Sequence, residues 1–396
     1  MVLRENLDRR DFLKIGGAAG IGLWLGNRSL SALAQQTPAP PPRPKTNIEE
    51  AIKVPKTKYS LPGLFPGRVV EVRDAGAIKD DKAVAKVVYR MFEKGLGGLT
   101  KKSGKDSFAL LFRKDDVVGI KVNPVGPGTI STHLEVVDAL IDWLVAGGLR
   151  RGNIIIWDRF DYMLKDAGFT PERYPGVGIE GLQTMDEAAA MGKTQDNSRW
   201  LRSEGTHVSV DNFDQEAYYW ADVEGPKDSA YLNQHVFNGK FSYFGKLLTK
   251  RLTKIINVPV FKNTGNGISM ATKNLGYGAV CNTNRLHGPL FFDVNTEVMA
   301  FPALRDKLVL NITDGLRGQY EGGPDYEGKF AYWLNTLYLS TDPFALDMVC
   351  HRAIVAKRKG MGIKVNEHPK FTDYLRYAER LGLGVVDPGK IQHVLV

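Results

Sequence analysis

The chain has 396 residues, and its 43% hydrophobic and 24% charged residues are the proportions of an ordinary globular protein. The formal net charge is +9 at pH 7, but no nucleic-acid-binding motif accompanies it, so we expect no nucleic-acid partner. The sequence holds two cysteines, Cys281 and Cys350, too few for an intrinsic four-cysteine zinc or iron–sulfur site. They either form a disulfide or stay as two separately buried thiols.

The N-terminal segment combines a basic stretch, a short apolar run and a small-residue end. The motif RRDFLK occupies residues 9–14, the apolar run spans residues 15–25, and the motif ALA ends at Ala34. This order resembles a twin-arginine (Tat) export signal, with Asp8 in place of the consensus Ser or Thr. The apolar run is shorter than the ~20 residues that a membrane-spanning helix needs. The alternative interpretation is a basic N-terminal helix of a cytosolic protein.

These signals divide the chain into three parts. Residues 1–34 are expected to be a signal peptide, which is cleaved near Ala34 after passage through the Tat translocase. Residues 35–46 are rich in proline and should form an extended linker. Residues 47–396 should form one soluble α/β domain in the periplasm or outside the cell. No later window is long and apolar enough for a stable membrane span.

The clearest structural unit lies between Asp116 and Arg159. Residues 117–122 and 153–157 are apolar enough to be buried strands, and apolar residues recur at helical spacing between them, from Leu134 onward. Thr132 is a candidate N-cap with Glu135 completing a capping box, and the glycines at 147–148 should end the helix. Strand, helix and strand joined by short links predict a right-handed βαβ unit with parallel strands.

The pattern returns in the second half of the chain. Strands are expected at 254–261, with a bulge or sheet edge at Pro259, and at 307–313 and 336–339. Helices are expected within 267–276, from an Asp342 N-cap to about 357, and over 371–381. Residues 160–245 look like an irregular insertion or lid. The predicted fold is therefore α/β, with a mostly parallel sheet flanked by helices.

Polar side chains follow the ends of the predicted strands, where open α/β sheets bind ligands. A Gly-rich turn with exposed amides and a helix start would form an anion site, helped by nearby lysines. The alternative is an ordinary strand–helix turn with surface lysines. The expected ligand-binding residues are Lys121, Asn123, Lys262, Gly265, Gly267, Lys273 and Asn274.

Three residues are candidates for a divalent metal site or for acid–base chemistry. His133 and His287 lie in loops near the predicted strand ends, and Asp314 ends the strand at 307–313. Together they provide the ligand types that divalent metals use, although a lone histidine is commonly a structural hydrogen-bonding group. The glycine-rich segment 315–324 is interpreted either as a mobile loop that closes over a ligand or as a surface turn.

Short motifs in a fixed order resemble the domain of unknown function 362 family over about residues 65–385. Many relatives are Tat substrates and carry an appended iron–sulfur module, whose cysteines are absent here. Relatives often have a histidine where Thr264 stands, so no role for that histidine is carried over. The motif positions that are carried over are Lys121, Lys262, Lys273, Asn274, Asp314 and Asp342. The motifs are VGIKVN (118–123), IIIWD (154–158), NVPVFK (257–262), ATKNLG (271–276), ITDG (312–315), GGP (322–324) and STDPFALD (340–347).

The family that the chain resembles has no assigned activity, so the resemblance assigns none to this chain. Our leading hypothesis is an exported enzyme, metal-dependent or redox-linked, that acts on a small anionic ligand. In it His287 and Asp314 serve as metal ligand or general base. The cofactor is not fixed by the sequence, and a divalent metal and a separate redox partner are both open. The alternative is a periplasmic binding or accessory protein for a small anion or redox partner, without turnover.

Overall fold

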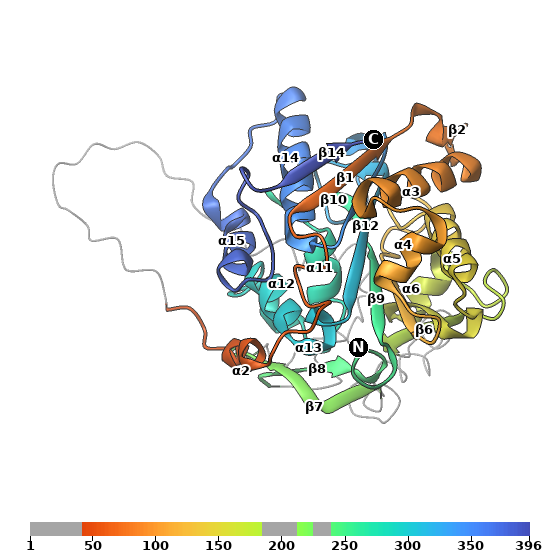
Figure 1. Cartoon of the computed structure of the whole chain (residues 1–396). Helices are drawn as coiled ribbons and strands as arrows, with labels where there is room; N and C mark the ends of the chain where they lie inside the picture. The colour runs from red at the N-terminus through yellow and green to blue at the C-terminus, as the bar shows by residue number, and fades with distance from the viewer. Residues whose placement is uncertain (1–41, 184–211, 225–238) are drawn as a thin grey trace, which may run out of the picture.

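The computed structural model of the protein describes residues 42–183, 212–224 and 239–396 (Figure 1). The expected signal peptide, its cleavage site and most of the linker lie outside the described residues, as do residues 184–211 and 225–238 of the expected insertion. No helix within the described ranges is long and apolar enough to cross a membrane.

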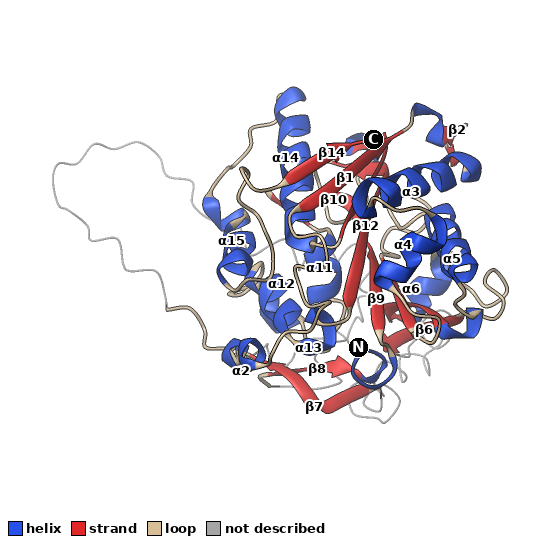
Figure 2. Ribbon diagram, viewed as in Figure 1, coloured by secondary structure: helices blue, strands red, loops and turns tan. Residues whose placement is uncertain are grey.

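A large sheet forms the centre of the described protein (Figure 2). β13 runs antiparallel to both of its neighbours, whereas the other pairs along the main path are parallel. The predicted α/β fold with a mostly parallel sheet is confirmed. In spatial order the strands are β14 (Gln392–Leu395), β1 (Arg68–Arg73), β13 (Ala331–Ser340), β12 (Leu308–Gln319), β9 (Lys254–Val258), β4 (Val118–Val122), β5 (Ile154–Phe160) and β6 (Gly178–Gln183), with β10 (Val260–Thr264) beside β12 and β11 (Gly267–Ile268) beside β10.

Helices cover both faces of this sheet, as Figure 1 shows. Side chains alternate between the two faces of a strand, so Ile156 of β5 packs into one core while Ile155 and Trp157 pack into the other. The first face carries α3 (Ala85–Thr100), α4 (Gly104–Leu111) and α5 (Leu134–Gly147), with α6 (Asp161–Asp166) beside β5 and β6. The second carries α11 (Ala271–Gly276), α12 (Asp293–Glu297), α13 (Pro302–Arg305), α14 (Pro343–Gly360) and α15 (Asp373–Arg380).

Shorter elements complete the described chain. β7 (Phe213–Trp220) and β8 (Phe241–Gly245) form a separate antiparallel pair, and β2 (Ile78–Lys79) pairs with β3 (Lys82–Ala83). Thus the expected insertion at 160–245 contributes β6 to the main sheet and a second small sheet. The remaining helical turns are α2 (Ile48–Lys53), η2 (Ala75–Ala77), η3 (Arg151–Asn153), η4 (Leu247–Arg251), η5 (Asn284–His287), η6 (Val298–Ala300), η7 (Gly328–Phe330) and η8 (Pro369–Phe371).

The predicted βαβ unit is present as β4, α5 and β5, and Val118 pairs with Ile154 in parallel register. Gly148, with a φ of 108°, ends α5 in the left-handed conformation that glycine adopts at low cost. The predicted capping box is wrong, because Thr132 is used elsewhere. Its hydroxyl accepts the Asn123 N–H at 2.8 Å and donates to the Val258 carbonyl at 2.8 Å.

Three boundaries in the second half differ from the prediction. The strand expected at 254–261 is interrupted at Pro259, which lacks an N–H, and β9 lies inside the sheet between β12 and β4. The Gly-rich turn joins β10 to β11 in a hairpin, so α11 begins only at Ala271. β12 continues to Gln319, which places Asp314 inside a strand and shortens the expected loop. The Asp342 cap is confirmed, since its Oδ1 accepts the N–H groups of Phe344 and Ala345 at 3.1 and 3.0 Å.

Candidate anion-binding site

The site contains a cluster of three lysines, which we call the lysine centre: Lys121 of β4, Lys262 of β10 and Lys273 of α11. Lys121 is buried and its ammonium is fully satisfied. It forms a salt bridge with Asp158 and donates to the Val122 carbonyl at 2.8 Å and to Asn274 Oδ1 at 3.2 Å. Burial lowers the pKa of Lys121, while the charge of Asp158 opposes that shift. Lys121 therefore has the surroundings of a structural buried cation.

Lys262 is as buried as Lys121, but few described groups compensate the charge of its ammonium. Its side chain is 1% exposed, and within the described residues it makes one hydrogen bond, from Nζ to Asn123 Oδ1 at 3.2 Å. No described carboxylate lies within salt-bridge distance of its Nζ. Burial, followed by repulsion from Lys273, lowers its pKa to about 7. An ammonium in these surroundings is close to losing its proton at neutral pH.

Lys273 of α11 is the third member of the centre. Its Nζ lies 5.4 Å from the ring centroids of both Tyr277 and Phe291, which stabilise a cation through their π faces. This Nζ makes no hydrogen bond or salt bridge to another described residue. Burial lowers its pKa to about 8, although part of its side chain remains accessible to solvent. The lysine centre thus opens toward solvent at Lys273.

Asp325 is the second carboxylate of the site, and the sequence did not identify it. Burial raises its pKa, while the charges of Lys262 and Lys273 act in the opposite direction. The segment that carries Asp325 is fixed by Gln319, whose Nε2 donates to the Asp325 carbonyl at 2.6 Å, and by the Gly323 N–H, which donates to Asn263 Oδ1 at 3.0 Å. No motif marked this aspartate, since it reaches the site only through the turn between β12 and β13.

Asparagine amides form the frame of the lysine centre. Asn274 donates to Asn257 Oδ1 at 2.8 Å, and Asn257 donates to Asn311 Oδ1 at 3.0 Å. Asn274 Oδ1 also accepts a hydrogen bond from Asn123 at 3.2 Å. These buried bonds tie α11 to β9 and to the residue that follows β4, and they tie β9 to β12.

Arg159 adds a further cation at the end of β5. Its guanidinium donates to Gln183 Oε1 and Thr283 Oγ1, both at 2.7 Å, and its charge contributes to lowering the pKa of Lys121. Among the described residues, three lysines and Arg159 therefore gather around two carboxylates, Asp158 and Asp325. Within the described part of the chain, the site therefore holds more cationic than anionic side chains.

The Gly-rich turn does not supply the anion-binding amides that its sequence suggested. The Gly265 N–H is directed to the Gly323 carbonyl at 3.4 Å, and Gly267 pairs with Thr264 in the β10–β11 hairpin. The first amides of α11, at Ala271 and Thr272, donate to the carboxylate of Asp347 at 2.8 and 2.9 Å. That carboxylate occupies the position where a bound anion was expected.

His287 and Asp314 have different partners and do not form a pair. His287 contacts the Thr283 carbonyl through Nδ1 at 3.1 Å and lies against the ring of Tyr277, with 4.5 Å between centroids. Burial, with a smaller effect from Lys273, lowers its pKa to about 4, so it is neutral at pH 7. His287 therefore belongs beside Lys273 and does not pair with Asp314.

Asp314 pairs with His133 instead. Asp314 Oδ2 accepts the backbone N–H of His133 at 2.7 Å and lies 2.9 Å from its ring Nδ1. Burial alone would lower the pKa of His133, but the charge and hydrogen bond of Asp314 outweigh it and raise the pKa. Within the described ranges, no three His, Cys, Asp or Glu side chains are arranged to hold a metal ion. The structure therefore does not bring His133, His287 and Asp314 together as one set of three ligands.

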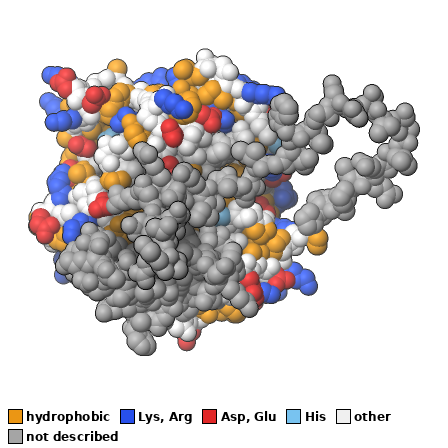
Figure 3. Space-filling model, turned by 180° about the vertical axis from the view of Figure 1, so that it is seen from behind, with side chains coloured by type: hydrophobic (Ala, Val, Ile, Leu, Met, Phe, Trp, Pro, Cys, Tyr) orange, Lys and Arg blue, Asp and Glu red, His pale blue; other side chains and the backbone are white. Residues whose placement is uncertain are grey.

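Other charged features lie away from the lysine centre. A hollow of about 820 Å³ is lined by α14, α15 and the segment after it, including Arg352, Arg376 and Glu379. None of the predicted site residues lines it. Around the rim of the face in Figure 3, cationic and anionic side chains are interspersed.

Cys281 and Cys350 are both buried and free, so of the two alternatives the structure has two separate thiols.

The comparisons with known proteins identify the family. The model of the family described as "Domain of unknown function (DUF362)" matches residues 118–352, a segment that runs from β4 into α14 and contains the whole lysine centre. No curated protein and no solved structure was found to match the chain. Because the matched segment is more than half of the sequence, the chain belongs to the DUF362 family.

Proposed function

We propose that the protein binds a small anion at the lysine centre and acts on it as an enzyme. The observation that supports this proposal is the state of Lys262 and Lys273. The Lys262 ammonium is buried and that of Lys273 is only partly accessible to water, and neither meets a carboxylate at salt-bridge distance among the described residues. A buried, unpaired charge costs several kcal/mol, and a bound anion would offset that cost.

Lys121 provides an internal comparison. It shows how this fold satisfies a lysine that has only a structural role, with one carboxylate and two further acceptors around its Nζ. Lys262 and Lys273 lie in the same cluster without such partners. The unmatched positive charge is therefore concentrated on these two residues, and a carboxylate or an oxyanion is the ligand chemistry that complements them.

Catalysis is supported by the proton affinities in the site. Lys262, with a pKa of about 7, can accept or release a proton at neutral pH, as a general acid or base must. His287 is neutral at that pH and can contribute a hydrogen bond without adding charge beside Lys273. Asp314 would orient His133 and fix its tautomer without serving as a metal ligand.

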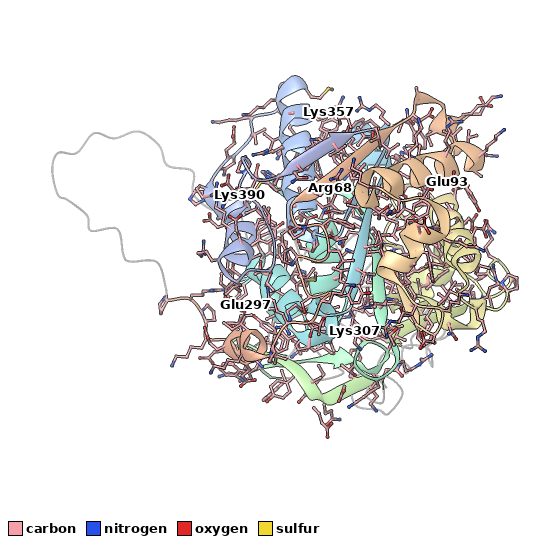
Figure 4. All side chains as sticks on the ribbon, viewed as in Figure 1. Arg68, Glu93, Glu297, Lys307, Lys357 and Lys390 are labelled. Carbon is pink, nitrogen blue, oxygen red and sulfur yellow. The ribbon has the colours of Figure 1, made fainter. Side chains whose placement is uncertain are left out.

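The experiment is a thermal-shift survey of the purified protein with phosphate, sulfate, oxalate and pyruvate at pH 7, followed by NMR detection of turnover of any ligand that binds. The proposal expects stabilisation of the wild-type protein by at least one anion, and loss of that effect in Lys262→Met and Lys273→Met. Lys307→Met is the matched control, because Lys307 is also a partly buried lysine with a lowered pKa. Lys307 lies just before β12 (Figure 4), at the end of that strand opposite to Gln319, which pairs with Lys262.

A binding protein without turnover is the second candidate. It is favoured by the dense frame of asparagines, which holds the centre rigid. Stabilisation by an anion that the protein leaves chemically unchanged over many hours would favour this candidate. Absence of stabilisation by all four anions would contradict both.

We also propose export by the Tat route, with the mature protein in the periplasm or outside the cell. The support is the motif around Arg9 and Arg10, which lies outside the described residues. The test is the location of the full chain in a Tat-competent bacterium. The Arg9→Lys, Arg10→Lys double variant should remain in the cytoplasm, and export of this variant at the wild-type level would contradict the proposal.

A further inference from the structure

We propose that Lys262 is an amine nucleophile that forms an imine with a small 2-oxo acid, whose carboxylate is bound by the Lys273 ammonium. This inference rests on the proposed anion site and names its substrate class and chemistry. It starts from the different surroundings of the three lysines.

Lys262 is the member of the lysine centre whose surroundings suit a neutral amine. Lys121 has three acceptors around its Nζ, one of them the Asp158 carboxylate, which together hold a full ammonium. Lys262 has one described acceptor, the neutral Asn123 Oδ1. A neutral amine can donate one N–H to that oxygen and keep its lone pair free for attack. Burial beside a second ammonium is a recognised way to activate a lysine.

Lys273 is suited to the opposite role. Two aromatic rings face its ammonium and favour the charged form. Asn123 links the two lysines, because its Oδ1 accepts the hydrogen bond of Lys262 Nζ and its amide donates to Asn274, the residue after Lys273. The charge of Lys273 also lowers the pKa of Lys262, so both amines belong to one site. A ligand with a carbonyl next to its carboxylate offers one group to each lysine, which selects 2-oxo acids among small anions.

Imine formation between Lys262 and the 2-oxo acid needs neither an oxidant nor a metal. The lone pair of Lys262 attacks the carbonyl carbon, a C–N bond forms, and the carbonyl oxygen becomes a hydroxyl. That oxygen then leaves as water with the two protons of the amine, and a C=N bond remains. A further proton on the nitrogen gives the iminium, next to which Asp325 supplies a negative charge.

The test is reductive trapping with pyruvate and sodium cyanoborohydride, followed by peptide mapping of the adducts by mass spectrometry. We expect a carboxyethyl adduct on Lys262, at least about tenfold more abundant than on a typical surface lysine. The yield in the wild-type protein should rise with pH through about 7 as Lys262 loses its proton. Lys262→Arg keeps the charge and should lose the adduct, whereas Lys307→Met should retain it.

Oxalate separates this inference from the proposed function, because it carries the charge but no reactive carbonyl. If oxalate binds and Lys262 remains unmodified by pyruvate, the imine chemistry is wrong and the anion site stands. If neither oxalate nor pyruvate binds and no adduct forms, both fail. Adducts confined to surface lysines of the wild-type protein would likewise overturn the inference, irrespective of how the variants fold.

Discussion

The Nζ atom of Lys262 lies 3.2 Å from Oδ1 of Asn123, and within the described residues this is its single hydrogen bond. The contact joins two segments that are far apart in the sequence, and it places a buried amine against a neutral acceptor. Asp158 forms a salt bridge with the neighbouring Lys121, whereas Lys262 and Lys273 meet no carboxylate at salt-bridge distance in the part of the chain that the structure describes.

Replacement of Lys262 by methionine should change the pH dependence of stability. The folded-state pKa of about 7 lies below the ordinary value of 10.5, so between these values the unfolded chain binds more protons and stability rises with pH. Relative to Lys262→Met, the wild-type free energy of unfolding should therefore increase by roughly 2 kcal/mol between pH 7 and 9. Denaturant titrations at both pH values measure this difference, and parallel pH profiles would contradict it.

Removal of the Asp158 carboxylate should strongly destabilise the protein. Asp158→Asn leaves Lys121 as a buried cation without its counterion, which typically costs about 3–5 kcal/mol. Adding Lys121→Met to Asp158→Asn should recover most of that loss, because no unpaired charge remains. Chemical denaturation of the two variants is the measurement. Equal stability of the single and double variants would show that the salt bridge is not the relevant interaction.

The pair of His133 and Asp314 should contribute stability that is lost as pH rises. The folded-state pKa of His133 is raised above 6.5, so its contribution is fully present below the unfolded value and disappears as pH passes the folded one. His133→Gln should remove this component. Asp314→Asn tests the charge separately, since its amide oxygen can still accept the His133 backbone N–H. If the free energy of unfolding changes with pH above 6.5 in the same way in the wild type and in both variants, the pair does not contribute this stability.

Substitution of Gly323 tests the turn that carries Asp325. A Cβ atom there would lie 2.2 Å from the Asn263 carbonyl oxygen and 2.6 Å from its Oδ1, so the turn must shift. Gly323→Ala should destabilise the protein by about 1–3 kcal/mol. It should also weaken anion binding, because the Asp325 charge favours the protonated forms of Lys262 and Lys273 and its displacement lowers their charge. Gly360→Ala is the control, since a Cβ at Gly360 meets nothing within 4 Å. Thermal unfolding and binding titrations should separate the two variants; identical behaviour would contradict the role of the turn.

The sequence predicted the parts of the fold that local patterns determine. Helical spacing, the glycine at 148 and the Asp342 cap marked α5 and α14 correctly, and the strand-end rule brought Lys121, Asn123, Lys262, Lys273 and Asn274 into one site. These features depend on residues that are near one another in the chain or on a general property of parallel sheets.

Long-range contacts limited the prediction of the site. Asp347, on α14, accepts the first N–H groups of α11, and the Gly-rich turn that was expected to bind an anion forms a hairpin. Asp314 is bonded to His133 and not to His287, because β12 extends past it into the sheet. Asp325 was missed because it lies in an irregular turn without a motif. None of these pairings has a periodic signal in the sequence.

The most direct measurement of the central claim is isothermal titration calorimetry of oxalate with the wild-type protein and its Lys262→Met, Lys273→Met and Lys307→Met variants. An anion site at the lysine centre predicts equal binding by the wild type and Lys307→Met, and at least about tenfold weaker binding by each variant of the lysine centre. Wild-type affinity should also fall as pH rises through about 7 and about 8, where Lys262 and Lys273 lose their charge. Binding of equal strength in all four proteins, or no binding by the wild type, would contradict an anion site at the lysine centre.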